Sequence, residues 1–384
     1  MTRIVLDDFA GHAFMLDLAE ALQRAGNDTT YTYCDTNLSP HAAFDDAEVP
    51  VQPISTRRPF EKYSIARRVI NELEYGWGSA RVLRRRRAEV SILNNLPLLS
   101  LAAPLLVGRL IGAHRIVWLQ DVQSGLVAGI SGNQGTAART ARRVEAFLLR
   151  RADTVIAISN ELAESARKFG IRPQRLCVIE NWAPLDDIDV GERDNVWSRQ
   201  HGLGERPRFV YSGTLARKHT PEVLVELAAA APEADVVVVS EGVGADWLSH
   251  ERDERELTNL RVLPFQPFES LPNVLASADI LVALLTQGAA GHSVPSKVLS
   301  YLCADRPILA SIPADNAAAR MVSERAGAGI IVEPGDTDAF VAAAKSLLAD
   351  PERRRALGAA GRRFAEATFS SDRVAEQIAA LTAH

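Results

Sequence analysis

Short apolar segments alternate with helix-patterned segments along the whole chain, and most of the apolar segments end in a polar or glycine-containing turn. Asp235–Ser240 contains four consecutive valines, which is typical of a parallel strand buried on both faces. Ala13–Ala25 has helical spacing of apolar residues and ends at Gly26. Since strands that alternate with helices form parallel sheets, this pattern predicts an α/β fold.

The chain is long enough for two domains of this class, because 384 residues is about twice a typical domain. A polar stretch rich in Gly and Pro interrupts the alternation between Asn181 and Arg208, after which the alternation restarts. We therefore predict one domain over residues 1–185 and a second over residues 186–369. A terminal helix within residues 370–384 is expected to pack back on the first domain.

The sequence also predicts where the protein works. No apolar run reaches the ~18–20 residues of a membrane span, and the N-terminus lacks the pattern of a signal peptide. Three scattered cysteines (Cys34, Cys177 and Cys303) suggest reduced thiols, and no Cys/His cluster has zinc-ligand spacing. We expect a cytoplasmic protein.

The net charge of −5 hides a basic segment, Arg57–Arg87, with ten basic and three acidic residues and interleaved aromatic side chains. Three interpretations compete: a solvated helical face, a surface for anionic lipid or a lipid diphosphate, and a nucleic-acid patch. Nucleic acid is disfavoured because the whole chain is acidic and no known binding module surrounds the patch. The lipid interpretation would place the protein peripherally at the inner face of the membrane.

The segment Gly291–Ser311 carries the strongest functional signal. A small polar loop with Pro295, Ser296 and Lys297 opens an apolar helix, and a buried strand follows. Free N–H groups and the positive end of the helix dipole favour an anion at such a loop. The same pattern also occurs as an ordinary loop–helix–strand unit of any α/β protein.

Six further segments fall in an order that resembles the retaining family 4 glycosyltransferases of the GT-B fold. Together with Gly291–Ser311 they span about 160 residues, and with the N-terminal strand and helix the resemblance covers nearly the whole chain. Within that family, the forms of the motifs found in this sequence are most similar to those of exopolysaccharide and colanic-acid-type sugar transferases. The segments are Arg150–Ser159, Cys177–Trp182, Phe209–Lys218, Val239–Gly244, Leu260–Phe265 and Leu271–Ile280.

The resemblance implies two Rossmann-like domains with an interdomain cleft, and transfer of a sugar from a nucleotide-diphosphate sugar with retention of configuration. It implies no metal and no other cofactor. A UDP-sugar is the default donor and GDP-sugars are the alternative. The acceptor is expected to be a saccharide or lipid-linked saccharide, in cell-surface polysaccharide or glycoconjugate biosynthesis.

Family motifs assign a set of donor-binding residues in the second domain. Lys218, and with it Arg217, would contact the diphosphate and stabilise the charge that develops as the sugar leaves. Lys297 is either a further phosphate contact or a surface lysine. The remaining assigned positions are Gly213, Thr214, Glu241, Phe265, Ser293, Val294, Pro295, Ser296 and Ser300.

In the first domain, the loop after the first strand should face the diphosphate. Gly11 allows close approach of the backbone, and His12 could touch sugar or phosphate or simply cap the next helix. Gln120 stands where family members often carry His, and it can hydrogen-bond the sugar without acting as acid or base. Asp121 would orient the acceptor hydroxyl or the sugar, unless it is a turn residue.

This sequence departs from the family at positions that bear on catalysis. Two glutamates of the family, eight residues apart, align with His292 and Ser300. His292 can still hydrogen-bond a sugar hydroxyl, and Ser300 would reach ribose through water. Thr214 stands where the family has an arginine. These changes motivate a noncatalytic partner subunit as an alternative; a GT-B nucleotide-sugar 2-epimerase is another, although its motifs were not found.

Replacing Lys218 with alanine should weaken nucleotide-diphosphate binding by roughly 1–3 kcal/mol, because a charge-assisted hydrogen bond is lost. Calorimetry on the folded variant measures the change. Affinity equal to that of the unaltered protein would remove Lys218 from the site.

Overall fold

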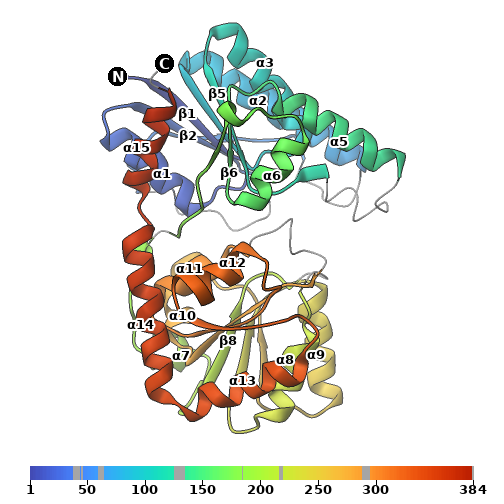
Figure 1. The fold of residues 1–384 in the computed structure, drawn as a ribbon, viewed down its shortest axis with the longest axis vertical. Coiled ribbons are helices and arrows are strands. Elements are labelled where there is room, and N and C mark those ends of the chain that lie inside the picture. The colour runs from blue at the N-terminus through green and yellow to red at the C-terminus, as the bar shows by residue number, and fades with distance from the viewer. Residues whose placement is uncertain are drawn as a thin grey trace. The chain divides into compact units, whose positions relative to one another are not determined.

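The computed structural model describes residues 1–37, 44, 46–58, 65–124, 135–183, 185–215, 219–287 and 295–382. The chain divides into two compact units, each with its own parallel sheet (Figure 1). The first comprises Met1–Glu180 with Ser371–His384, and the second comprises Asn181–Ser370. The division between Glu180 and Asn181 lies five residues before the junction predicted from sequence.

The sheet of the first unit has seven strands among the described residues, in the order β3-β2-β1-β4-β5-β6-β7, with every neighbouring pair parallel. The strand order reverses its direction next to β1, which lies between β2 and β4. The strands are β1 Arg3–Asp8, β2 Asp28–Cys34, β3 Val51–Ile54, β4 Val90–Asn94, β5 His114–Leu119, β6 Thr154–Ala157 and β7 Leu176–Val178.

Helices cover both faces of this sheet (Figure 1). One hydrophobic core joins the strands to α2, α3, α5 and α6, while the C-terminal helix α15 packs beside α1. Ser371 donates a hydrogen bond to Asp17 of α1 at 3.0 Å, and Arg24 pairs with Asp372 at 3.1 Å. The helices are α1 Ala13–Arg24, α2 Ile65–Arg86, α3 Ala102–Ile111, α5 Thr136–Leu149, α6 Asn160–Lys168 and α15 Ser371–Thr382.

The second unit has a six-stranded parallel sheet among the described residues, in the order β10-β9-β8-β11-β12-β13. Its strand order reverses between β8 and β11. The strands are β8 Arg208–Ser212, β9 Asp235–Val239, β10 Leu260–Leu263, β11 Ile280–Leu284, β12 Ile308–Ser311 and β13 Gly329–Val332.

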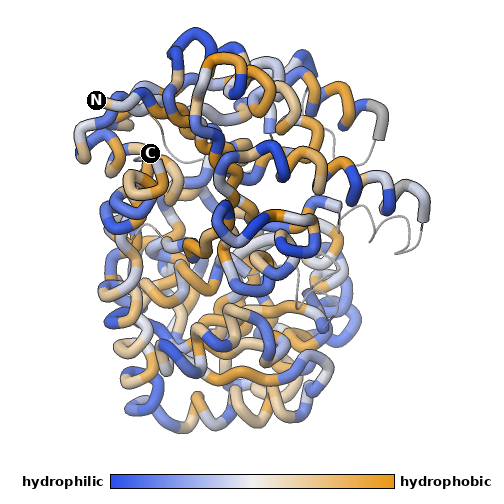
Figure 2. Tube along the Cα trace, turned by 45° about the horizontal axis from the view of Figure 1, so that its top comes forward, coloured by the Kyte–Doolittle hydropathy of each residue, from blue (hydrophilic) through white to orange (hydrophobic). Residues whose placement is uncertain are grey.

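The helices of the second unit pack against its sheet or against one another. One core cluster joins the sheet to α8, α9 and α13, and α11 packs against α14. Hydrophilic and hydrophobic residues alternate along the helices in Figure 2, as in helices with one buried and one exposed side. The helices are α7 Val196–Gln200, α8 Glu222–Ala230, α9 Val243–Glu254, α10 Leu271–Ala276, α11 Lys297–Cys303, α12 Ala317–Arg320, α13 Thr337–Ala349 and α14 Pro351–Thr368.

The predicted α/β class is confirmed. The valine run forms β9, whose residues are all buried. The sequence analysis missed β3, which has four residues and contains Pro53. Proline is tolerated there because β3 lies at the edge of the sheet. No helix in the described part of the chain is long and apolar enough to cross a membrane.

Candidate functional site

Polar side chains gather at the carboxyl ends of the central strands of the first sheet. Asp8 is the last residue of β1 and Asn94 the last of β4, and the two are partners in the parallel register. Loops that follow strands on either side of a reversal in strand order diverge, and this leaves room for a ligand. The first unit therefore places these two buried residues where an α/β protein binds its substrate.

The carboxylate of Asp8 organises this edge. It accepts hydrogen bonds from the His12 main-chain N–H at 2.5 Å, from the Tyr31 hydroxyl at 2.9 Å and from the Asn94 amide at 2.9 Å. His12 Nδ1 lies 3.0 Å from Asp8 Oδ1. The Gln120 amide donates to Asn94 Oδ1 at 2.8 Å. His12 and Gln120, both expected in the site, are thus linked through Asn94 and Asp8.

The same contacts shift the pKa values of Asp8 and His12 in opposite directions. Burial alone would raise the pKa of Asp8, but the imidazole and the N–H of His12 and the Asn94 amide together hold it below its ordinary value. Burial alone would lower the pKa of His12, but the Asp8 carboxylate holds it above its ordinary value. The His12 side chain is 39% exposed, and its Nε2 makes no hydrogen bond to any described residue. The Asp8 carboxylate thus favours the protonated imidazole and fixes its orientation at the strand edge.

Gly11 makes the tight turn that brings His12 to Asp8. Its φ of 72° lies in the left-handed region, and its N–H donates to the Asp8 carbonyl at 3.0 Å. Asp121 directly follows Gln120 beyond the end of β5 and is half-buried.

Asp7 points to the helix α2 rather than to the edge. It accepts hydrogen bonds from the Tyr75 hydroxyl at 2.5 Å and from the Ser79 hydroxyl. Complete burial raises the pKa of Asp7 to about 7, and the two hydroxyls only partly offset this effect. Adjacent residues of β1 therefore carry carboxyl groups with opposite pKa shifts.

In the second unit, Gly213 and Lys297 meet where the strand order reverses. Gly213 follows β8 with φ of 127°, and a Cβ there would come within 3.2 Å of Cε and Nζ of Lys297. Lys297 Nζ lies 3.5 Å from the centre of the Tyr211 ring, which is a cation–π contact. The Tyr211 hydroxyl donates to the carbonyl of Thr214 at 3.0 Å, so the ring under the ammonium is fixed.

A second tyrosine ties α11 to the same strand. The Tyr301 hydroxyl accepts from the Ser212 N–H at 2.9 Å and donates to the Ser212 carbonyl at 3.2 Å. Burial raises the pKa of Tyr301, which keeps the hydroxyl protonated and able to donate. Since Lys297 is one turn earlier on α11, this contact also sets the position of the ammonium.

The ends of β9 and β10 form the next part of this edge. The Phe265 N–H donates to Glu241 at 3.3 Å, and the Leu215 N–H donates to Ser240 at 3.0 Å. A neighbouring cavity encloses about 430 Å³ beside the N-terminal end of α9. It is lined by His219, Thr220, Pro221, Glu222, Val243, Gly244 and Trp247.

The residues expected from sequence divide into two groups by unit. Gly11, His12, Gln120 and Asp121 lie at the edge of the first sheet. Gly213, Thr214, Glu241, Phe265 and Lys297 follow strands of the second sheet or begin α11, with Pro295 buried, Ser296 exposed and Ser300 half-buried. Lys218, Arg217, His292, Ser293 and Val294 lie outside the described residues.

Sequence reasoning missed Asp8, Asn94, Tyr31, Tyr211 and Tyr301. Asp8 and Asn94 carried a signal, because each is a polar residue that ends an apolar run. The three tyrosines lie within strands or a helix and read as core residues, and only the hydrogen bonds of their hydroxyls distinguish them.

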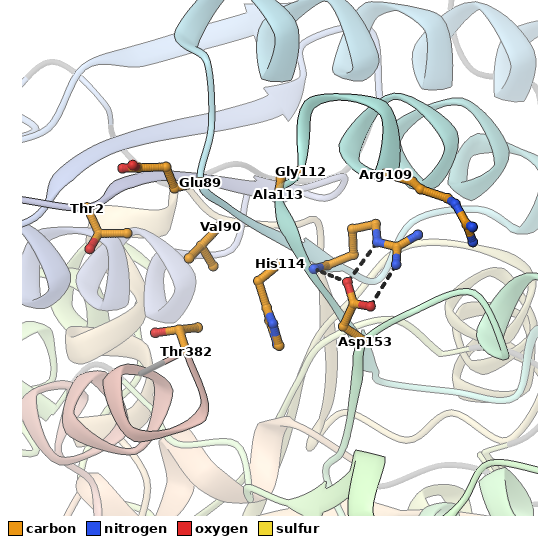
Figure 3. Close-up of a pocket in the computed structure, with 10 residues that line it drawn as sticks. Thr2, Glu89, Val90, Arg109, Gly112, Ala113, His114, Asp153 and Thr382 are labelled. Atoms are coloured by element: carbon orange, nitrogen blue, oxygen red, sulfur yellow. Dashed lines mark hydrogen bonds and ion pairs between the residues drawn. The ribbon is translucent and has the colours of Figure 1, made fainter. Parts of the chain in front are cut away.

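Within the described ranges, no group of three His, Cys, Asp or Glu side chains is placed to hold a metal ion. The expectation of a reaction without metal stays a prediction. A further cavity of about 510 Å³ opens at the amino edge of the first sheet, opposite to Asp8 (Figure 3). The paired side chains of Arg115 and Asp153, 2.7 Å apart, form part of its wall.

Comparison with known families decides the identity. The model of the glycosyl transferase 4-like domain matches residues 10–182, and the model of glycosyl transferases group 1 matches residues 194–364. The chain belongs to the group 1 glycosyltransferases. The resemblance stated from the sequence motifs is confirmed.

Curated relatives of this glycosyltransferase point to glycoconjugate synthesis. WcaI of Escherichia coli K12, named as a colanic acid biosynthesis glycosyl transferase, is 24% identical over 71% of this chain and 68% of its own. A GDP-mannose-dependent phosphatidylinositol monomannoside mannosyltransferase of Mycolicibacterium smegmatis is 28% identical over 48% of this chain and 49% of its own.

Solved structures support the GT-B fold. Sucrose-phosphate synthase of Thermosynechococcus elongatus has a TM-score of 0.76 at 18% identity, covering 99% of this chain and 98% of its own. HepE of Anabaena, solved with UDP and glucose, has a TM-score of 0.75 at 15% identity, covering 99% of both chains.

The buried carboxyl of Asp7 predicts a pH effect on stability. Between about pH 4, its ordinary pKa, and pH 7, the folded state holds a proton that the unfolded state has lost, so wild-type stability falls across this window. Asp7→Asn has no such proton. Its free energy of unfolding relative to wild type should rise across the window by an amount on the order of a few kcal/mol.

Thermal or urea unfolding at several pH values between 4 and 8 measures the difference. Asp315→Asn is the control, because that carboxyl is exposed. Parallel pH dependence of Asp7→Asn and wild type would contradict the argument.

Proposed function

We propose that this glycosyltransferase moves a sugar from a nucleotide-diphosphate sugar, a UDP-sugar as first candidate, to a saccharide or lipid-linked saccharide. The transfer retains the anomeric configuration and serves cell-surface polysaccharide or glycoconjugate biosynthesis. The proposed place of action is the cytoplasm, at the inner face of the membrane. UDP in the HepE structure and the GDP-mannose dependence of the mycobacterial relative motivate the two candidate donors.

The observation that carries the proposal is the placement of Lys297 beside Gly213. A departing diphosphate gains negative charge as the glycosidic bond breaks, so a positioned cation lowers the barrier. Lys297 is held over Tyr211 on one side, and Gly213 presents a backbone without a side chain on the other. A phosphate could approach this backbone closely, which a Cβ at residue 213 would prevent.

The first unit supplies complementary chemistry. The His12 imidazole and the Gln120 amide can donate hydrogen bonds to phosphate or sugar oxygens. Asp8 is enclosed by its four donor groups and is completely buried, so it is not itself a nucleophile. This fits a mechanism in which a donor phosphate oxygen, rather than an enzyme carboxylate, takes the acceptor proton.

A noncatalytic partner subunit is the second candidate, motivated by His292 and Ser300 in place of the two family glutamates. Incubation of the purified protein with UDP- and GDP-sugars and a lipid-linked saccharide separates the two. Product formed with the donor's anomeric configuration supports the transferase. Nucleotide binding without turnover of any donor favours the partner subunit.

Lys297→Ala should weaken UDP binding by about 1–3 kcal/mol, because the charge-assisted contact to the diphosphate is lost. Calorimetry measures the change. Lys345→Ala, at an exposed position of α13, is the matched control and should bind as the wild type does. If both variants keep wild-type affinity, Lys297 is not a phosphate ligand.

We also propose that α2 contacts an anionic membrane. Its exposed stripe is apolar in the first half, where Ile70, Leu73 and Trp77 are 52–56% exposed. Arg81 and Arg84 continue the stripe, and the Arg81 guanidinium lies 5.5 Å from the Trp77 ring. Apolar and aromatic side chains beside arginines suit a lipid interface with anionic headgroups.

The variant Arg81→Ser/Arg84→Ser/Arg85→Ser should co-sediment less with phosphatidylglycerol vesicles than the wild type, and the difference should grow at low salt because screening is weaker. The three positions are exposed, whereas Arg86 pairs with Asp28 and is left intact. Equal sedimentation at low salt would leave a solvated helical face as the explanation of the basic segment.

A further inference from the structure

Five cationic side chains surround a cavity of the first unit that is lined by residues of α5 and of the C-terminal end of α6. The cavity encloses about 380 Å³. We call it the arginine cavity. Its lining consists of Arg139, Arg142, Arg143, Ala146, Arg150, Lys168, Phe169 and Gly170.

The helix α5 presents its arginines on one side. Arg139, Arg142, Arg143 and Arg150 have the i, i+3, i+4 and i+11 spacing that places side chains on the same face of a helix. Phe169, which is 6% exposed, forms the apolar floor of the cavity. The Arg142 guanidinium lies 5.7 Å from the centre of the Phe169 ring. The guanidinium groups line a common space, and each of these arginine side chains is exposed to solvent.

These charges lack carboxylate partners in the described part of the chain. Arg139, Arg142, Arg143 and Lys168 form no ion pair there. Glu145 interacts electrostatically with Arg142, but its two oxygens accept main-chain N–H groups at 2.9 and 3.0 Å. Residues 125–134, which precede α5, contain no Asp or Glu. Like charges gathered without partners repel one another, and an external anion would relieve that repulsion.

Helix stability does not account for the arginines either. Arg139 is the fourth residue of α5, near the positive end of the helix dipole, where a cation is unfavourable. Only Lys168, in the last turn of α6, has the position that a dipole favours.

We propose that the arginine cavity binds a phosphate or diphosphate group that carries at least two negative charges. Guanidinium forks match phosphate oxygens in bidentate pairs, and several forks around one space favour a multiply charged group over a single carboxylate. The group belongs either to a soluble phosphorylated compound or to a lipid headgroup. This inference does not depend on the identity of the sugar donor.

The test uses the full chain and the variant Arg139→Ser/Arg142→Ser/Arg143→Ser. The control is Arg353→Ser/Arg355→Ser/Arg363→Ser, which removes the same charge from exposed positions of α14. The thermal midpoints of the cavity variant and the control variant are first compared with that of the wild type. If the serine variant of the cavity unfolds, a variant with lysine at the same three positions replaces it and keeps the charge. Calorimetry with pyrophosphate probes the soluble source, and sedimentation with vesicles of equal phosphatidylglycerol and phosphatidylcholine probes the headgroup source.

Loss of about tenfold or more in pyrophosphate affinity in the cavity variant, with the control unchanged, supports the proposal and identifies a soluble ligand. Unchanged pyrophosphate affinity with reduced vesicle binding in the cavity variant alone supports it and identifies a headgroup. If pyrophosphate binds only in the second unit, the wild type, the cavity variant and the control variant should bind it with equal affinity. Equal binding in both assays overturns the proposal.

Discussion

The buried carboxylate of Asp8 is the interaction on which the polar edge of the first unit depends. A buried charge is tolerated only when it is paired and hydrogen-bonded, so Asp8 requires the donors that His12, Tyr31 and Asn94 provide. That requirement orients the loop after β1, the end of β4 and, through Asn94, the Gln120 amide. One charged group thereby sets the geometry of three segments that are distant in sequence.

The second unit reaches a similar result without a buried charge. Two tyrosine hydroxyls bind main-chain groups around the end of β8, and one of the rings supports the ammonium of Lys297. Each unit thus presents a cation at the place where the order of its strands reverses. His12 contacts Asp8, and Lys297 contacts the Tyr211 ring; Asp8 and Tyr211 are themselves held by further hydrogen bonds. Donors fixed in this way stabilise a developing negative charge.

The cationic character of the first unit extends beyond this edge. Met1–Glu180 and Ser371–His384 together contain 24 basic and 21 acidic residues, and many of the basic ones lie on α2 and α5. The inner side of α2 supplies Tyr75 and Ser79 to Asp7, while its outer side carries Trp77 and the arginines. A single helix therefore joins the exposed basic surface to the strand that ends in Asp8.

Much of the fold could be predicted from the sequence, because the spacing of apolar residues that marks a helix or strand involves only residues close together in the chain. The valine run of β9 and the glycine after α1 indicate local conformation directly, so the α/β class followed from such segments. The two-unit organisation followed from the chain length and the polar stretch between the two runs of alternation. The edge strand β3 could not be found this way, since four residues with a proline carry too little periodicity.

The sequence by itself determined the family, the alternation of strands and helices, and residue types suited to phosphate and sugar. Tertiary structure alone decided that Asp7 faces α2 while Asp8 faces His12, and that Lys297 rests on Tyr211. These outcomes depend on register and on contacts between residues up to 86 positions apart, such as Asn94 with Asp8. Side-chain direction in a strand alternates with every residue, so a shift of one residue in register would have exchanged the two carboxyl groups.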